Sequence, residues 1–145
     1  MPSDTGPDDR PVVLLDTSAA VALVLADHEW HDLARAATRG RRLGLAGHAW
    51  FETFSVLTRL PAGVRRSPAD AARILAHNFP ASEFLDETRT RELTSELSGL
   101  GIAGGAVYDV LVGAAARVHG RPLLSGDARA RPTYEALGVL VEPLE

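Results

Sequence analysis

The sequence predicts an α/β protein, a three-layer α/β/α sandwich around a mainly parallel sheet. Short apolar runs alternate along the chain with segments whose apolar residues recur at helical spacing, an order typical of a parallel sheet with helices on both faces. The length of 145 residues and the hydrophobic content of 46% suit one domain with a real core. We expect residues 1–10, rich in Pro, Gly, Ser and Asp, to be a disordered tail before a single domain over 11–145.

The individual elements follow from apolar patterning and from capping residues. Strands are expected at the short apolar runs, 12–15, 43–46, 122–125 and 139–142, with a short pairing segment at 83–85. Helices are expected over 18–25, 29–39, 49–60, 68–78, 87–97, 106–119 and 132–137. Ser67, Pro68 and Asp70 supply a cap residue, a proline and an acid for the first turn of the fourth helix. Gly40 and Gly120 close two of the others.

The third and sixth of these helices have distinctive sequences. In 49–60 the larger apolar residues are spaced to share one face: Phe51, Phe54, Leu57 and Leu60. The segment 106–119 is the most apolar helix of the chain and follows a glycine-rich loop at 99–105. Its neighbouring side chains are expected to bury every face of that helix.

Composition excludes several kinds of chemistry. The chain has no cysteine, which removes disulfides, thiolate metal sites and cysteine nucleophiles. All 15 basic residues are arginine, so Schiff-base lysines and the Walker A phosphate loop are also excluded. The net charge is −4, of which residues 1–10 carry −2. Residues 11–145 therefore carry −2. If bound metal neutralised four carboxylates of a site in this part of the chain, its net charge would become +2, so the total charge does not exclude an RNA partner.

No segment predicts a membrane span or export. The apolar runs fall short of the roughly 20 residues that a membrane-spanning helix needs, and the first ten residues are acidic and polar rather than basic and then apolar. The lack of cysteine is compatible with a reducing compartment. We therefore expect a cytoplasmic protein with no membrane partner.

Acidic residues stand where apolar ones would be expected. Asp16 directly follows the run 12–15, and Asp127 follows Leu-Leu-Ser-Gly in the same way, so both would lie at the edge of the sheet where ligands bind. Asp109 is the only charged residue within 106–116, and Glu52 is surrounded by aromatic residues. An unpaired buried carboxylate is costly and needs a partner or a metal ion.

Each acid also has a simpler interpretation. Asp16 could be a helix cap, Asp109 a buried hydrogen-bonded acid, Glu52 a solvated residue and Asp127 a turn residue. On pattern alone the simpler interpretation is favoured for Glu52 and Asp127. For Asp109 the pattern favours neither the simpler interpretation nor a functional one. Taken together, two strand ends and two helix faces can converge on an all-oxygen site. Such a site suits Mg²⁺ or Mn²⁺, which activate water and offset charge on a phosphate.

A family resemblance rests on four segments. The chain contains, in order, LLDTSAAVAL, ETFSVLTRLP, YDVLVGAAA and LLSGDARARPTYEALGV. Over residues 12–144 it resembles the PIN-domain toxins of VapBC toxin-antitoxin pairs. The resemblance implies a PIN-like fold, endoribonuclease activity dependent on Mg²⁺ or Mn²⁺, a homodimer, and inhibition by a cognate VapB-like antitoxin.

The resemblance also assigns residues. Asp16, Glu52, Asp109 and Asp127 match the four acidic positions of the family, as catalytic residues and metal ligands. Ser18 and Ser125 fall where family members often place a hydroxyl beside the metal. Two departures concern the fourth acid, because Ser125 stands where threonine is commoner and Gly126 where a polar residue is usual.

Other polar and aromatic residues are candidates for contact with RNA. Arg59, Arg65 and Arg66 flank the turn at 61–63, and Arg129 follows Asp127. These four, and Arg131 after them, are candidates to contact RNA phosphate, Arg129 foremost, although arginine can also simply solvate a surface. Two tryptophans could stack on bases: core packing is expected for Trp50, and Trp30 lies on an early helix that could meet the antitoxin or a dimer partner. No histidine is assigned to the metal.

Two rival functions compete with that of a nuclease. A phosphatase or a receiver-like domain also places an aspartate after its first strand, but both use a lysine, which this chain lacks, and the phosphatase wants an acid at position 18. A catalytically inactive PIN-like module that binds RNA or protein is the alternative, and the presence of all four acids speaks against it. The RNA target is not readable from the sequence.

Overall fold

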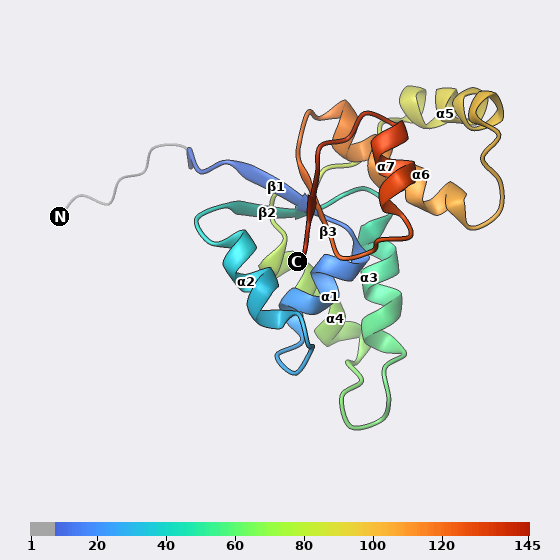
Figure 1. The fold of residues 1–145 in the computed structure, drawn as a ribbon. Coiled ribbons are helices and arrows are strands. Elements are labelled where there is room, and N and C mark those ends of the chain that lie inside the picture. Colours follow the sequence, from blue (N-terminus) through green and yellow to red (C-terminus); the bar gives the residue numbers. More distant parts are fainter. Residues whose placement is uncertain (1–7) are drawn as a thin grey trace.

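The computed structural model describes residues 8–145, which form a four-stranded parallel sheet covered by helices (Figure 1). The strands β1 (Val12–Leu15), β2 (Arg42–Leu45), β3 (Leu123–Ser125) and β4 (Val141–Pro143) lie in the order β2-β1-β3-β4. The helices are α1 (Thr17–Val24), α2 (His31–Thr38), α3 (Ala49–Thr58), α4 (Pro68–Asn78), α5 (Glu87–Leu100), α6 (Ala106–Val118) and α7 (Arg131–Ala136). In Figure 1, α1 to α4 lie on one side of the sheet and α5 to α7 on the other. The predicted three-layer α/β fold is confirmed.

Strand β1 is the centre of the core. All four of its residues are buried, and it pairs in parallel with β2 from Val12↔Arg42 to Leu15↔Leu45 and with β3 at Leu14↔Leu123 and Leu15↔Leu124. Helices cover both faces of the sheet, which explains why this strand is apolar without alternation. The pairing continues one residue beyond the strand, because the Asp16 amide donates to the Leu124 carbonyl at 3.2 Å. The first acid is thereby fixed at the carboxyl end of the sheet.

A short segment covers the outer edge of β2. The amides of Ala81 and Glu83 donate to β2 carbonyls at 2.9 and 3.2 Å, and Ala46↔Glu83 is a single parallel bridge. The predicted pairing at 83–85 is therefore one bridge rather than a strand, and it begins nearer residue 81. Gly44 permits the approach, since a Cβ there would lie 2.3 Å from the Ala81 carbonyl oxygen.

The predicted face of α3 is wrong at one position. The buried residues of this helix are Ala49, Thr53 and Leu57, which are four apart and share one face. Phe51 lies about 200° around the helix from Ala49, and it is 66% exposed. Two other differences concern bounds: α2 begins at His31 after Trp30, and α5 runs on to Leu100, where Gly101 ends it at a φ of 66°.

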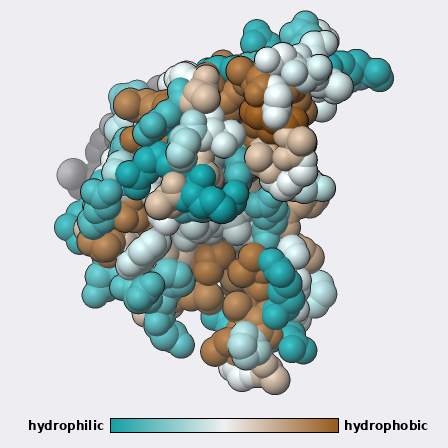
Figure 2. All heavy atoms as spheres, turned by 45° about the vertical axis from the view of Figure 1, so that its right-hand side comes forward, coloured by the Kyte–Doolittle hydropathy of each residue, from teal (hydrophilic) through white to brown (hydrophobic). Residues whose placement is uncertain are grey.

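The surface carries apolar side chains in separate areas. Figure 2 shows two such areas on one face, one in the upper part and one in the lower part, with hydrophilic residues between them. The large apolar side chains with the greatest exposure are Leu140, Phe51, Tyr108, Leu100 and Phe84. Within residues 8–145, no helix is both long and apolar enough to cross a membrane.

The expected disordered tail falls mostly outside the described residues, since these begin at Asp8. Residues 8–10 are exposed, and Arg10 pairs with Asp8. The carbonyl of Arg10 accepts a hydrogen bond from Arg42 Nε at 2.8 Å. The last residue of the expected tail therefore contacts the start of β2.

Thr53 supplies a test of the packing of α3. Its hydroxyl is fully buried and has no hydrogen-bond partner within residues 8–145. An unpaired buried hydroxyl costs folding free energy, so we expect Thr53→Val to raise the free energy of unfolding by about 1 kcal/mol in urea denaturation. In the control, Thr38→Val removes a buried hydroxyl that donates to the Ala34 carbonyl at 2.8 Å, and it should lower that free energy by about 1 kcal/mol. Equal responses of the two variants would contradict this account.

Candidate active site

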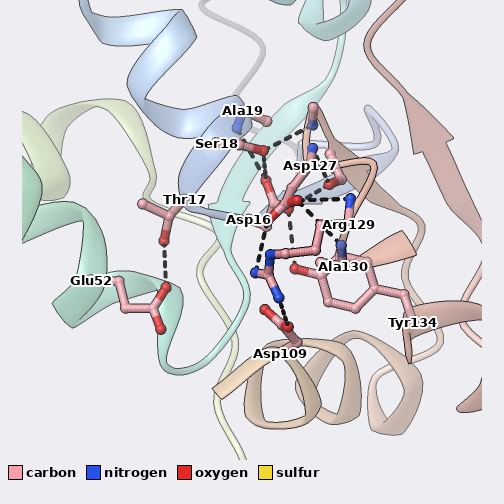
Figure 3. A network of polar contacts seen from close by, with 12 residues as sticks. Asp16, Thr17, Ser18, Ala19, Glu52, Asp109, Asp127, Arg129, Ala130 and Tyr134 are labelled. Atoms are coloured by element: carbon pink, nitrogen blue, oxygen red, sulfur yellow. Dashed lines mark hydrogen bonds and ion pairs between the residues drawn. The ribbon is translucent and has the colours of Figure 1, made fainter. Parts of the chain in front are cut away.

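A pocket of about 200 Å³ opens where β1 and β3 end, and all four predicted acids line it. We call it the acid pocket, defined by Asp16, Glu52, Asp109 and Asp127. Asp16 follows β1, Glu52 and Asp109 come from the first turns of α3 and α6, and Asp127 follows β3. Figure 3 shows the four side chains converging from these separate elements. The fold therefore brings together acids that lie far apart in the sequence.

Asp16 is the most buried of the four, with 3% of its surface exposed. One carboxylate oxygen accepts from the Ser18 hydroxyl at 2.6 Å and the Ala19 amide at 3.1 Å. The other accepts from the Ser125 hydroxyl at 2.5 Å and the Tyr134 hydroxyl at 3.1 Å. Burial raises the pKa of this carboxyl, and the hydrogen bonds from the two serines act in the opposite direction. Asp16 also caps α1, so the simpler interpretation holds alongside the functional one.

The two serines that were predicted beside the site link the ends of β1 and β3. Besides bonding Asp16, the Ser18 oxygen accepts from the Gly126 amide at 2.9 Å, and the Ser125 oxygen accepts from the Asp127 amide at 3.1 Å. Each hydroxyl therefore donates to the first acid and accepts from the loop that carries the fourth. The position of Asp127 depends on the same contacts that hold Asp16.

Gly126 is explained by a close contact with Trp30. A Cβ at position 126 would lie 2.5 Å from the indole ring of Trp30, so a side chain at this position would displace the tryptophan. The loop beyond it is a turn, as the simpler interpretation of Asp127 proposed, because one Asp127 oxygen accepts from the amides of Arg129 and Ala130 at 3.0 and 3.2 Å. The departure from the family pattern thus has a packing reason.

Arg129 bridges two of the acids. Its guanidinium donates to Asp109 Oδ2 at 3.1 Å and to Asp127 Oδ2 at 3.2 Å. The hydrogen bond to Asp109 is the main cause that raises the pKa of Arg129. The expectation that α6 is buried on every face is wrong at its first turn, where Tyr108 is 51% exposed and Asp109 faces the acid pocket. The buried residues of α6 are Val110 and 112–116, while Leu111 and the last two residues of the helix are partly exposed.

Glu52 stands on the α3 side of the acid pocket, apart from the other three acids in Figure 3. One of its oxygens accepts from the Thr17 hydroxyl at 3.0 Å, and the other lies 3.6 Å from His48 Nε2. The His48 ring stacks on Tyr108 with ring centres 5.2 Å apart. Glu52 is thus oriented by α1 and borders solvent.

The remaining predicted contacts are not all near the acids. Arg65 and Arg66 bond the carbonyls of Leu60 and Val64, so these two arginines hold the turn after α3 and are not part of the acid pocket. Trp50 packs edge-on against Phe84 at 5.9 Å. Arg59 and Trp30 line a second hollow beside the acid pocket.

Sequence reasoning missed two residues that orient the acids. Thr17 follows Asp16 directly, so the spacing alone could have suggested it. Tyr134 has no comparable signal, because its contact with Asp16 depends on how α7 packs against the end of the sheet.

The side chains of the acid pocket suit a hard divalent cation, since carboxylates are the ligands that Mg²⁺ and Mn²⁺ prefer. Within residues 8–145, however, no group of three acidic or histidine side chains is already poised around a single ion position. The guanidinium of Arg129 lies between Asp109 and Asp127 and partly balances their charge. The residues therefore fit a cation by their chemistry, with Arg129 bonded to two of the acids that would hold it.

Comparisons with known proteins agree with this geometry. The PIN domain matches residues 13–135. Ribonuclease VapC27 of Mycobacterium tuberculosis is 45% identical over 132 residues, covering 91% of this chain and 96% of the relative, and Ribonuclease VapC40 of the same species is 46% identical over 132 residues, covering 88% and 95%. The crystal structure of VapBC2 from Rickettsia felis bound to a DNA fragment from its promoter has a TM-score of 0.66 at 12% identity, covering 92% of this chain and 99% of that one. This last likeness shows a shared fold.

The hydrogen bond from Tyr134 to Asp16 can be tested by its effect on stability. Tyr134→Phe removes a donor to a buried carboxylate and should lower the free energy of unfolding by about 1.5–3 kcal/mol. The control is Tyr108→Phe, because the Tyr108 side chain is half exposed, and this change should stay within about 0.5 kcal/mol. Urea denaturation of both variants measures the difference. A Tyr134→Phe protein as stable as the parent would show that the bond contributes nothing.

Proposed function

The chain belongs to the PIN-domain family, within it to the VapC ribonucleases, and on this basis we propose that it cuts RNA internally with Mg²⁺ or Mn²⁺ held in the acid pocket. The membership rests on the PIN match over 13–135 and on relatives about 45% identical over nine tenths of the chain. It makes the protein a ribonuclease of the toxin class. The metal, its ligands and the mode of cleavage are the proposal.

One observation supports the proposal most strongly. Four carboxylates from four separate elements face one pocket of about 200 Å³, and nucleases that use a divalent cation need such a convergence of hard oxygen ligands. The catalytically inactive alternative has no comparable support, because no acid of the set is missing or turned away from the pocket.

The acids would divide the work according to their surroundings. When bound, the cation would supply activation of water and offset the negative charge of the scissile phosphate. Asp16 is held by four donors, so it would be the fixed ligand that sets the position of the site. Glu52 accepts one hydrogen bond, from Thr17, lies 3.6 Å from His48 Nε2 and borders solvent, so it can move to accept a proton or a ligand bond.

The arginines would bind the substrate backbone. A guanidinium makes paired hydrogen bonds to phosphate oxygens, and Arg129 already lies at the acids. Once it releases Asp109 or Asp127, we expect it to hold the phosphate beside the cut. Arg59 follows the last residue of α3, and Arg65 and Arg66 remain candidates for more distant phosphates.

Regulation and assembly follow from the same family membership. We propose that a cognate VapB-like antitoxin inhibits this chain, that the chain forms a homodimer, and that it acts in the cytoplasm as a single domain over 11–145. The similar structure from Rickettsia felis is that of VapBC2, which supports a VapB-like antitoxin as a partner.

Cleavage of total RNA tests the proposed function directly. With Mg²⁺ or Mn²⁺ the purified protein should produce discrete new RNA ends, and EDTA should abolish them. Asp16→Asn and Asp109→Asn should each lower the rate by about 100-fold or more, because each removes a charged ligand. The control Asp70→Asn changes an exposed acid on α4 and should leave the rate unchanged. Cutting that persists in Asp16→Asn would exclude the assigned site.

Arg129 provides a second test, on metal affinity rather than activity. Arg129→Ala removes a positive charge bonded to two of the proposed ligands, so we expect Mn²⁺ to bind about tenfold more tightly in calorimetry. The control is Arg131→Ala, because Arg131 pairs with Glu145 outside the acid pocket, and it should leave the affinity unchanged. Weaker Mn²⁺ binding by Arg129→Ala would show that this arginine supports the metal site rather than competing with the ion.

A further inference from the structure

A second hollow of about 430 Å³ adjoins the acid pocket, and we call it the side groove. It shares four residues with the acid pocket: Thr17, Ser18, Glu52 and Asp127. Beyond them its walls include Trp30, His28, Ser55 and Arg59. A molecule bound in the acid pocket could therefore continue into the side groove without leaving the surface.

One wall of the side groove is formed by one face of α3 and by Arg59, the residue that caps the C-terminus of this helix. Glu52, Ser55 and Arg59 are three and four residues apart, the spacing that aligns side chains along a helix. Arg59 lies about 10 Å along the helix axis from Glu52, at 1.5 Å per residue. Arg59 is exposed, and within residues 8–145 it makes no ion pair. This wall thus carries a cation at a fixed distance from the acids.

The lining of the side groove also includes an aromatic ring, that of Trp30. Trp30 is partly buried against the core, and its indole lies against Gly126, next to Asp127. The His28 ring stands beside it at 6.1 Å, and His28 Nδ1 accepts from the Trp30 amide at 3.0 Å. An aromatic ring that is held in place and partly open is the platform on which an unpaired base stacks.

We propose that the side groove binds a nucleotide adjoining the cut, with its base on Trp30 and a phosphate at Arg59. The inference rests on the proposed function, and it identifies the substrate at this position as single-stranded RNA, since bases in a duplex cannot stack on a side chain. A protein helix would need a continuous apolar groove, whereas hydroxyl and charged side chains stand among the apolar ones in this groove, with Arg59 and Glu52 on the same wall. The exposed Phe51 lies in a different hollow, with Phe84.

Tryptophan fluorescence can test the stacking, because the chain has only Trp30 and Trp50. Trp50→Phe leaves Trp30 as the reporter, and Trp30→Phe leaves Trp50, which packs against Phe84 outside the side groove. Both are prepared with Asp109→Asn, to prevent cutting, and titrated with a single-stranded RNA oligonucleotide and Mg²⁺. We expect RNA to quench Trp30 and not Trp50.

A charge-matched pair of variants tests the phosphate contact. Arg59→Gln should weaken RNA binding roughly threefold to tenfold. It should also lower the slope of log affinity against log salt concentration by about one. The control Arg91→Gln removes the same charge from α5, where Arg91 pairs with Glu87, and should change neither quantity. Because Arg59 is exposed, its variant should fold even where Trp30→Phe does not.

Three results would overturn the inference: an unquenched Trp30, equal effects of the two arginine variants, or quenching of Trp30 by the cognate antitoxin and not by RNA. The last would make the side groove a protein-binding surface. None of these results would contradict the proposed function, which is tested separately by metal-dependent cleavage and its loss in Asp109→Asn.

Discussion

The buried carboxylate of Asp16 is the constraint on which both the fold and the candidate site depend. It accepts hydrogen bonds from α1, from the end of β3 and from α7, and without them the cost of burying a carboxylate would be several kcal/mol. These elements can therefore pack around β1 only in an arrangement that aims their donors at one point. That requirement also places Asp127, since the serines that donate to Asp16 accept from its loop.

The charges of the acid pocket are partly balanced by other side chains of the chain. Asp109 and Asp127 share the guanidinium of Arg129, and Glu52 has His48 nearby and Thr17 as a donor. Within residues 8–145, Asp16 pairs with no cation and relies on hydroxyl and amide donors. The site is thus rigid at its buried end and adjustable at its open end, as expected where a cation and a phosphate must enter and leave.

The local sequence pattern was sufficient to predict features that depend on a single helix or strand. Apolar runs and caps placed the strands and most helices to within a few residues, and acids at strand ends indicated the edge of the sheet. Pattern failed where the result depends on packing between elements. The periodicity of 49–60 did not reveal that Ala49, Thr53 and Leu57 face the core and Phe51 does not. Likewise, nothing near Tyr134 in the sequence shows that it bonds Asp16, and the contact of Trp30 with Gly126 joins residues far apart in the chain.

The segment over β2 has a consequence for how copies of this chain can associate. An open strand edge offers unpaired amides and carbonyls on which another chain can add a strand, a common route to aggregation. Here the backbone amides of Ala81 and Glu83 donate hydrogen bonds to carbonyls along that edge. Gly44 has no side chain, which lets this segment come close enough to do so. This side of the sheet is therefore a poor template for intermolecular β-structure. Association between copies is left to the helices and to the β4 side.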